Sequence, residues 1–174
     1  MSLVDIISIA GGIASIAQPI INWFAEQSPH RAEKHADIQK AYMGYKSENK
    51  LNCAVLSRIQ LEKINTRKIG DPAVKDIAAT LQTKAADTLL VSLFSLIQQP
   101  SKAVKTMTGK KLTKEEIEEA KKIITSIISA QEKIKELQCF TALGKEAQEI
   151  IGGFYVRARL KHIKEKSLYV KQRL

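Results

Sequence analysis

The chain has 174 residues, of which 44% are hydrophobic and only 5% aromatic, with 8 glycines and 4 prolines. This composition favours a helical bundle over β-sandwiches and barrels, which depend on aromatic and β-branched residues and on frequent Gly or Pro turns. The length suits a single domain with a sizeable core. The net charge of +10 favours polyanionic partners, although Lys-rich helical proteins are also often simply soluble.

Residues 1–27 are predicted to form an apolar, small-residue-rich first helix. No charged side chain occurs from Ile6 to Ala25, in a chain that is 26% charged. The apolar positions cover most of a helical circumference, so lipid, neighbouring copies or the chain's own bundle must shield this helix from water. Pro19 is expected to kink it. The residues predicted to contact a membrane or neighbouring subunits are Ile6, Ile9, Gly11, Gly12, Ile13, Ser15, Ile16, Ile20, Trp23 and Phe24.

Small residues recur every three or four positions in this first helix, a spacing that lets helix backbones approach closely. Self-association in a bilayer and a tight crossing inside a water-soluble bundle both fit this pattern. The segment lacks the basic start of a secretory signal, and its polar residues make it a marginal transmembrane helix. The two stripes are Ala10, Ala14 and Ala17, and Ser8, Gly12 and Ser15.

Residues 28–174 are predicted to form the helical bundle proper, within a single domain overall. A long helix is expected over residues 28–69, starting at Ser28 and Pro29 and with a break near residues 44–49. The sequence Gly-Asp-Pro at residues 70–72 predicts a helix end followed by a new start, because Gly, Asp and Pro favour the C′, N-cap and N1 positions. The third helix is then expected to continue to about Gln98.

Residues 100–112 are predicted to be a loop, and a capping box at Thr113 and Glu116 starts a helix that runs to Gly144. The final element is interrupted by Gly152 and Gly153. It places Val156, Leu160, Ile163, Val170 and Leu174 on one face. The predicted fold class is all-α, an elongated antiparallel bundle of four to five helices with an apolar N-terminal helix.

Cationic residues surround the apolar face of the final helix. An amphipathic basic helix fits an anionic membrane surface or a phosphate backbone, and a solvated charged face equally well. No RNA- or DNA-binding signature accompanies it, so nucleic-acid contact would be non-specific. The residues predicted to contact a polyanion are Arg157, Arg159, Lys161, Lys164, Lys166, Lys171 and Arg173.

No catalytic site, metal site, cofactor or small-molecule substrate is predicted. Residues 108–111 lack the first Gly and the Ser or Thr of a P-loop. His30 and His35 lie on different sides of a helix. Cys53 and Cys139 belong to no disulfide or metal pattern and are expected to be buried free thiols. The sequence does not determine where the protein is located. Free thiols are compatible with a reducing intracellular compartment or a virion, and membrane association is compatible with the apolar first helix.

The main functional hypothesis is a non-enzymatic structural or membrane-active helical protein that self-assembles. Its N-terminal helix would pack against lipid or neighbouring subunits, as in a virion or pore-type component. The alternatives are a basic coat or packaging protein that binds nucleic acid non-specifically, and a soluble helical adaptor. The layout is loosely similar to that of helical virion proteins and of cell-death bundles with a membrane-inserting helix. No motif of either group maps onto numbered residues, so no site is transferred.

Overall fold

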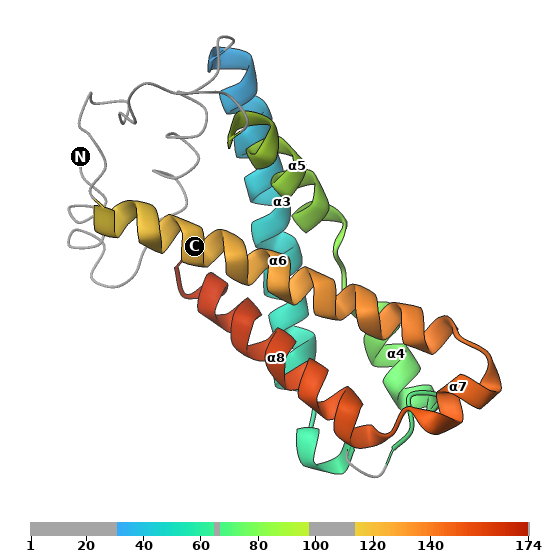
Figure 1. Cartoon of the computed structure of the whole chain (residues 1–174). Helices are drawn as coiled ribbons and strands as arrows, with labels where there is room; N and C mark the ends of the chain where they lie inside the picture. Colours follow the sequence, from blue (N-terminus) through green and yellow to red (C-terminus); the bar gives the residue numbers. More distant parts are fainter. Residues whose placement is uncertain (1–30, 65–66, 98–113, 174) are drawn as a thin grey trace.

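The computed structural model describes residues 31–64, 67–97 and 114–173 (Figure 1). These residues are helical and contain no strand, which confirms the predicted all-α class. The predicted first helix, the start at Ser28 and Pro29, Thr113 and the loop at 100–112 lie outside the described residues. The elements are α3 (Arg31–Ser57), the 3₁₀ helix η1 (Leu61–Ile64), α4 (Pro72–Thr80), α5 (Lys84–Ile97), α6 (Lys114–Ala142), α7 (Lys145–Ile150) and α8 (Gly153–Lys171).

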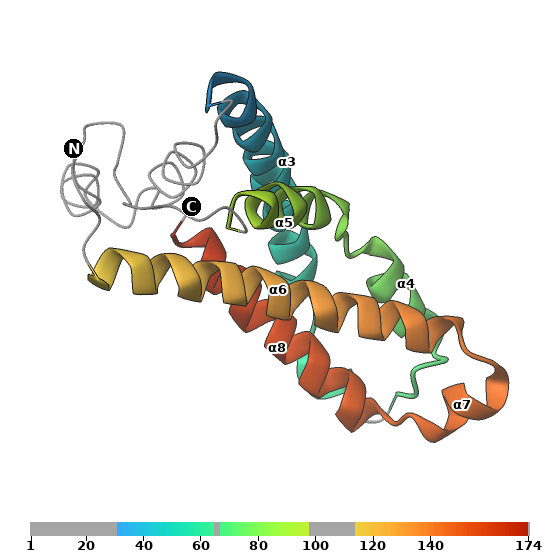
Figure 2. The same ribbon diagram turned by 45° about the horizontal axis from the view of Figure 1, so that its top comes forward.

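Two antiparallel helix pairs form the body of the molecule. Helices α6 and α8 run side by side in opposite directions, and α5 runs back along α3 (Figures 1 and 2). The two pairs cross each other, so that α3 packs against α8, and α5 against α6. The short helices α4 and α7 lie at the end where α6 turns into α8 (Figure 1).

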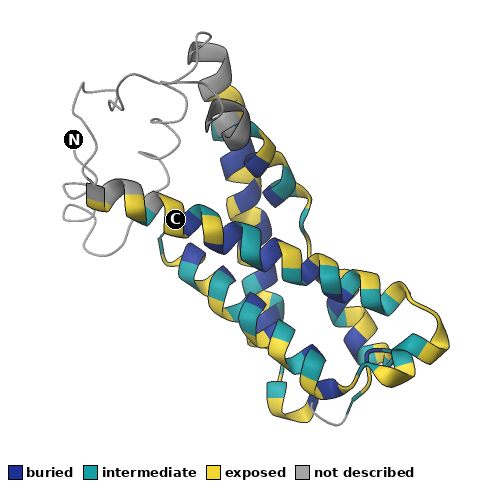
Figure 3. Cartoon of the chain, in the orientation of Figure 1, coloured by how far each residue is buried: buried dark blue, intermediate teal, exposed yellow. Residues whose placement is uncertain are grey.

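The main core lies where α3, η1, α4, α6 and α8 meet (Figure 3). Helix α8 contributes residues spaced three and four apart, which lie on one side of a helix. Its side chains at Val156, Leu160, Ile163 and Val170 are fully buried, which confirms the apolar face predicted for them. The core cluster consists of Leu56, Ile64, Ile69, Val74, Ala78, Leu81, Ile134, Leu137, Val156, Leu160 and Ile163.

The break predicted near residues 44–49 is wrong, because α3 continues through Gly44 to Ser57. Two of the polar residues that suggested a break, Glu48 and Asn49, are buried and hydrogen-bonded to other helices, whereas Lys46, Ser47 and Lys50 are exposed. Asn49, for example, donates a hydrogen bond from Nδ2 to the carbonyl oxygen of Ser167 on α8, at 3.0 Å. Gly44 lies beside α5, and a Cβ placed there would be 3.8 Å from the Cβ of Ala85, which is an ordinary contact distance.

The predicted helix start at residues 70–72 is confirmed. Asp71 is the N-cap of α4, its carboxylate accepts a hydrogen bond from the backbone N–H of Ala73 at 2.9 Å, and Pro72 occupies the first helical turn. The helix before it ends earlier than predicted, at Ser57 rather than at Ile69. The chain reaches Asp71 through η1 and a connecting segment, so residue 70 does not terminate a helix as predicted.

The third predicted helix is in fact two helices, because the chain leaves helical geometry at residues 81–83. Leu81 adopts an extended backbone and buries its side chain in the core. The side-chain amide of Asn52 on α3 makes two hydrogen bonds with the backbone of Gln82. Its Nδ2 donates to the carbonyl oxygen at 2.8 Å, and its Oδ1 accepts from the N–H at 2.9 Å. Glu48, one turn earlier on α3, caps the start of α5. The break is therefore held by side chains of another helix.

Candidate functional site

Helix α8 carries six of the seven residues that the sequence predicts to contact a polyanion, and the seventh, Arg173, lies just beyond its end. Its apolar face is buried, so these cations divide between the side that meets α6 and the side that faces away from it. The two groups have different surroundings.

Arg159 points toward α6 and is neutralised there. Its Nε lies 3.1 Å from a carboxylate oxygen of Glu136, and its guanidinium stacks over the ring of Tyr155, 3.2 Å from the ring centroid. The hydrogen bond from Lys133 to Glu136, at 2.6 Å, is the main cause that lowers the pKa of Glu136, and Arg159 adds to it. Arg159 therefore fastens α8 to α6.

Arg173 makes an equivalent contact at the other end of α8. Its Nε lies 2.8 Å from an oxygen of Glu119, and its guanidinium carbon lies 3.5 Å from the ring centroid of Tyr169. The Tyr169 hydroxyl donates to the same glutamate at 3.0 Å. Burial, and then this hydrogen bond, raise the pKa of Tyr169. Arg159 and Arg173, both predicted to contact a polyanion, thus each already have a carboxylate partner on α6.

His162 also faces α6, and its Nε2 lies 2.6 Å from the hydroxyl oxygen of Ser129. Burial lowers the pKa of His162, and the nearby charges of Lys166 and Lys133 lower it further. Lys166 therefore belongs to the α6 side as well. Among the described residues no carboxylate is hydrogen-bonded to the other ring nitrogen of His162. The pair consequently lacks the third member that orients a catalytic histidine, and it joins the two helices.

The remaining cations, Arg157, Lys161, Lys164 and Lys171, form what we call the basic stripe. Their spacings of three, four and seven residues place them along one side of α8. Within the described part of the chain their only ion pair is a loose one, 4.0 Å between Lys161 and Glu165, with both side chains more than 60% exposed. Exposed pairs of this kind are weak, and the other three cations have no carboxylate partner among the described residues. The basic stripe thus presents a row of largely uncompensated positive charge.

Two large apolar side chains lie exposed at the beginning of this row. Ile150 at the end of α7 is 82% exposed, and Phe154 in the first turn of α8 is 78% exposed. Phe154 precedes Arg157 and Lys161 by three and seven residues, so it lies on the same side of the helix. We call Ile150 and Phe154 the apolar tip, because they lie at the end of the molecule where α7 meets α8 (Figures 1 and 3).

The sequence reasoning missed the apolar tip. Its only local signal is the Gly152-Gly153 interruption, followed directly by an aromatic residue. Ile151, between the two exposed residues, packs against the core, and its carbonyl accepts a hydrogen bond from the backbone N–H of Ile69 at 3.1 Å. A hydrophobicity pattern cannot show which of three neighbouring apolar residues faces the core.

The predicted membrane or subunit contacts between Ile6 and Phe24 lie outside the described residues. Within the part that the structure describes, no helix is both long and apolar enough to cross a bilayer. The same part contains no group of three or more His, Cys, Asp or Glu side chains arranged to hold a metal ion. Cys53 is half-buried and Cys139 is exposed, so the expectation of a buried thiol is wrong for Cys139.

Comparisons with known proteins give no relative for this chain. No family, no curated protein and no solved structure matches it.

Proposed function

We propose that this chain is a non-enzymatic, membrane-active helical protein that binds anionic lipid surfaces through the outer side of α8. The observation that carries the proposal is the position of the apolar tip at the beginning of an uncompensated basic stripe. The apolar segment 6–25 would supply a second lipid contact. Self-assembly on the membrane is part of the same hypothesis.

The combination of charge and exposed apolar area favours lipid over nucleic acid. Each Lys or Arg near an anionic membrane contributes about 1 kcal/mol, so the basic stripe supplies roughly 4 kcal/mol. Burial of an Ile or Phe side chain adds about 1.5–3 kcal/mol in an apolar medium. A phosphate backbone rewards the cations but offers no apolar layer for Ile150 and Phe154. A bilayer surface uses both features.

Sedimentation of the full chain with phosphatidylcholine vesicles that contain phosphatidylserine tests the basic stripe. We expect the variant Arg157→Gln/Lys161→Gln/Lys164→Gln/Lys171→Gln to bind up to roughly a thousandfold more weakly, the equivalent of about 4 kcal/mol. A matched control removes the same charge elsewhere, at Lys63, Lys75, Lys121 and Lys122, which are exposed on η1, α4 and α6. Equal losses in the two variants would show that net charge, rather than the basic stripe, governs binding.

Vesicles of phosphatidylcholine alone separate the two proposed lipid contacts. They attract the uncharged segment 6–25 but not the basic stripe, because they carry no net charge. We therefore expect the four-residue variant to bind neutral vesicles as the native chain does.

The variant Ile150→Ser/Phe154→Ser distinguishes lipid from nucleic acid. We expect it to lose at least about tenfold in affinity for anionic vesicles, since one fully buried side chain of this size is worth more than that. Its affinity for duplex DNA should match that of the native chain. Val91→Ser is the control, because Val91 on α5 is also exposed, at 69%. Unchanged vesicle binding together with stripe-dependent, salt-sensitive DNA binding would favour the coat or packaging alternative.

A further inference from the structure

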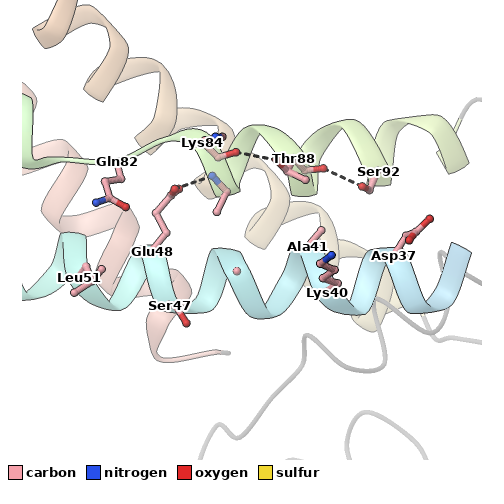
Figure 4. A pocket seen from close by; sticks show the side chains of 12 residues that line it. Asp37, Lys40, Ala41, Ser47, Glu48, Leu51, Gln82, Lys84, Thr88 and Ser92 are labelled. Atoms are coloured by element: carbon pink, nitrogen blue, oxygen red, sulfur yellow. Dashed lines mark hydrogen bonds between the residues drawn. The ribbon is translucent and has the colours of Figure 1, made fainter.

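An open groove of about 710 Å³ runs between α3 and α5, on the side away from α6 and α8 (Figure 4). The α3 side of the groove extends from Asp37 to Leu51. These positions span 14 residues, or about 21 Å of helix. The lining is Asp37, Lys40, Ala41, Gly44, Ser47, Glu48 and Leu51 of α3, Gln82, and Lys84, Ala85, Thr88 and Ser92 of α5.

The floor of the groove contains small residues, and an exposed apolar side chain lies at one end of it. Ala41 and Gly44 of α3 lie opposite α5, and a Cβ at Gly44 would be in ordinary contact with the Cβ of Ala85. Leu51, at one end of the lining, is 55% exposed. Small residues in such a stripe let a further helix approach closely. The surface therefore resembles half of a helix–helix interface.

We infer that this groove is the docking site, in the absence of lipid, of the chain's own apolar segment 6–25. The segment directly precedes α3, which begins at Arg31, two turns before the groove. A reversal at Ser28 and Pro29 would lay it antiparallel along α3, as in an αα-hairpin. About five linking residues reach roughly 17 Å, more than the 8–10 Å between packed helix axes.

The antiparallel register brings the small residues of the two helices together. With the turn centred on residue 28, a residue a given number of positions before 28 lies opposite the residue the same number of positions after it. This count places Ser15 opposite Ala41, Gly12 opposite Gly44 and Ser8 opposite Glu48, next to Ser47. The small-residue stripe of the segment thus meets the small-residue floor of the groove, and the backbones can approach closely.

Charge also favours this segment over a second copy of the whole chain. The first 29 residues contain Asp5 and Glu26 but no Lys or Arg, whereas the whole chain carries +10. Lys40, Lys84 and Asp37 are exposed at the groove, and Asp37 lies at the end away from Leu51 and Lys84. Glu48 is occupied by hydrogen bonds to the backbone of α5. The same register brings Asp5 to the end of the groove formed by Leu51, Gln82 and Lys84.

The inference goes beyond the proposed function, because it concerns the protein free of lipid. It gives the apolar segment a place that hides much of its circumference from water. Lipid and groove would then compete for the same segment. Failure of the membrane proposal would leave the docking site intact, and the experiment below contains no lipid.

Disulfide trapping in the full chain tests the docking site. In a background of Cys53→Ala and Cys139→Ala, the variant Ser8→Cys/Ser47→Cys is oxidised in dilute solution and analysed by non-reducing electrophoresis. The control is Ser8→Cys/Ala158→Cys, because Ala158 is exposed on the outer side of α8. Ser47 is exposed as well, so neither pair disturbs the core. Circular dichroism verifies that both variants keep the helical fold.

We expect an intramolecular disulfide between positions 8 and 47 to form at least about tenfold faster than the control disulfide, since docking holds the two thiols within bonding range. A Gly44→Leu substitution, which fills the groove, should remove that advantage. Equal rates for the two pairs would overturn the inference. Exclusively intermolecular disulfides between positions 8 and 47 would also overturn it, because the groove would then accept a second copy.

Discussion

The start of α5 depends on one carboxylate from another helix. Glu48 of α3 is 5% exposed, and its two oxygens accept hydrogen bonds from the backbone N–H groups of Ala85 at 2.7 Å and Ala86 at 3.0 Å (Figure 4). These donors lie in the first turn of α5, where N–H groups have no partner within the helix. Glu48→Ala removes both acceptors at once.

The magnitude follows from the contacts that are lost. Loss of a helix cap costs about 0.5–2 kcal/mol, and a hydrogen bond to a charged group contributes about 1.5–3 kcal/mol. Release of the carboxylate from its buried position offsets part of this loss. We therefore expect Glu48→Ala to lower the free energy of unfolding by about 2 kcal/mol, and Tm by roughly 4–8 °C for a chain of this length. Glu48→Gln retains one oxygen acceptor and should cost about half as much.

Urea unfolding followed by far-ultraviolet circular dichroism measures the effect. The control is Glu132→Ala on α6, since Glu132 is exposed and its loss should change stability by less than about 0.5 kcal/mol. Hydrogen exchange should also show faster exchange at the start of α5 in Glu48→Ala. Equal stability of Glu48→Ala and the control would refute the argument that this side chain fixes the break between α4 and α5.

Three further predictions concern the core, the titration of His162 and the two thiols. Leu160→Ala, at a fully buried position, should lower the free energy of unfolding by about 2–5 kcal/mol in the same urea assay. The folded state lowers the pKa of His162 below 6.5, because it favours the neutral imidazole. The stability that the neutral side chain contributes is therefore fully present above pH 6.5 and is lost as the pH falls through the folded pKa. The native chain should therefore lose more stability than His162→Gln between pH 7.5 and 5.5. Burial raises the pKa of the Cys53 thiol, so maleimide labelling followed by mass spectrometry should find Cys139 modified first, and equal rates would contradict this.

The sequence predicted the parts of the fold that depend on local chemistry. Asp71 and Pro72 begin a helix because a carboxylate cap and a fixed φ angle act within one turn. The buried face of α8 followed from the 3.6-residue period of its apolar positions, with Val156 and Leu160 as examples. Both inferences needed only neighbouring residues.

The candidate site was predictable in part. The sequence placed the cations on α8, but it could not tell which of them face α6 and which face away from it. Arg159 and Arg157 differ by two positions, yet Arg159 meets Glu136 of α6 while Arg157 joins the basic stripe. That difference depends on which neighbouring helix each side faces.

The sequence by itself determined that this chain is helical, basic and apolar at one end, because composition and periodicity act along the chain. The tertiary structure decided where the helices break and which charges stay free. The helix continues through residues 44–49 while Glu48 and Asn49 bond to α5 and α8, and residues 81–83 interrupt a helix because Glu48 and Asn52 of α3 satisfy the freed backbone groups. These arrangements are stabilised by hydrogen bonds to residues 30 or more positions away, and no local pattern identifies such partners.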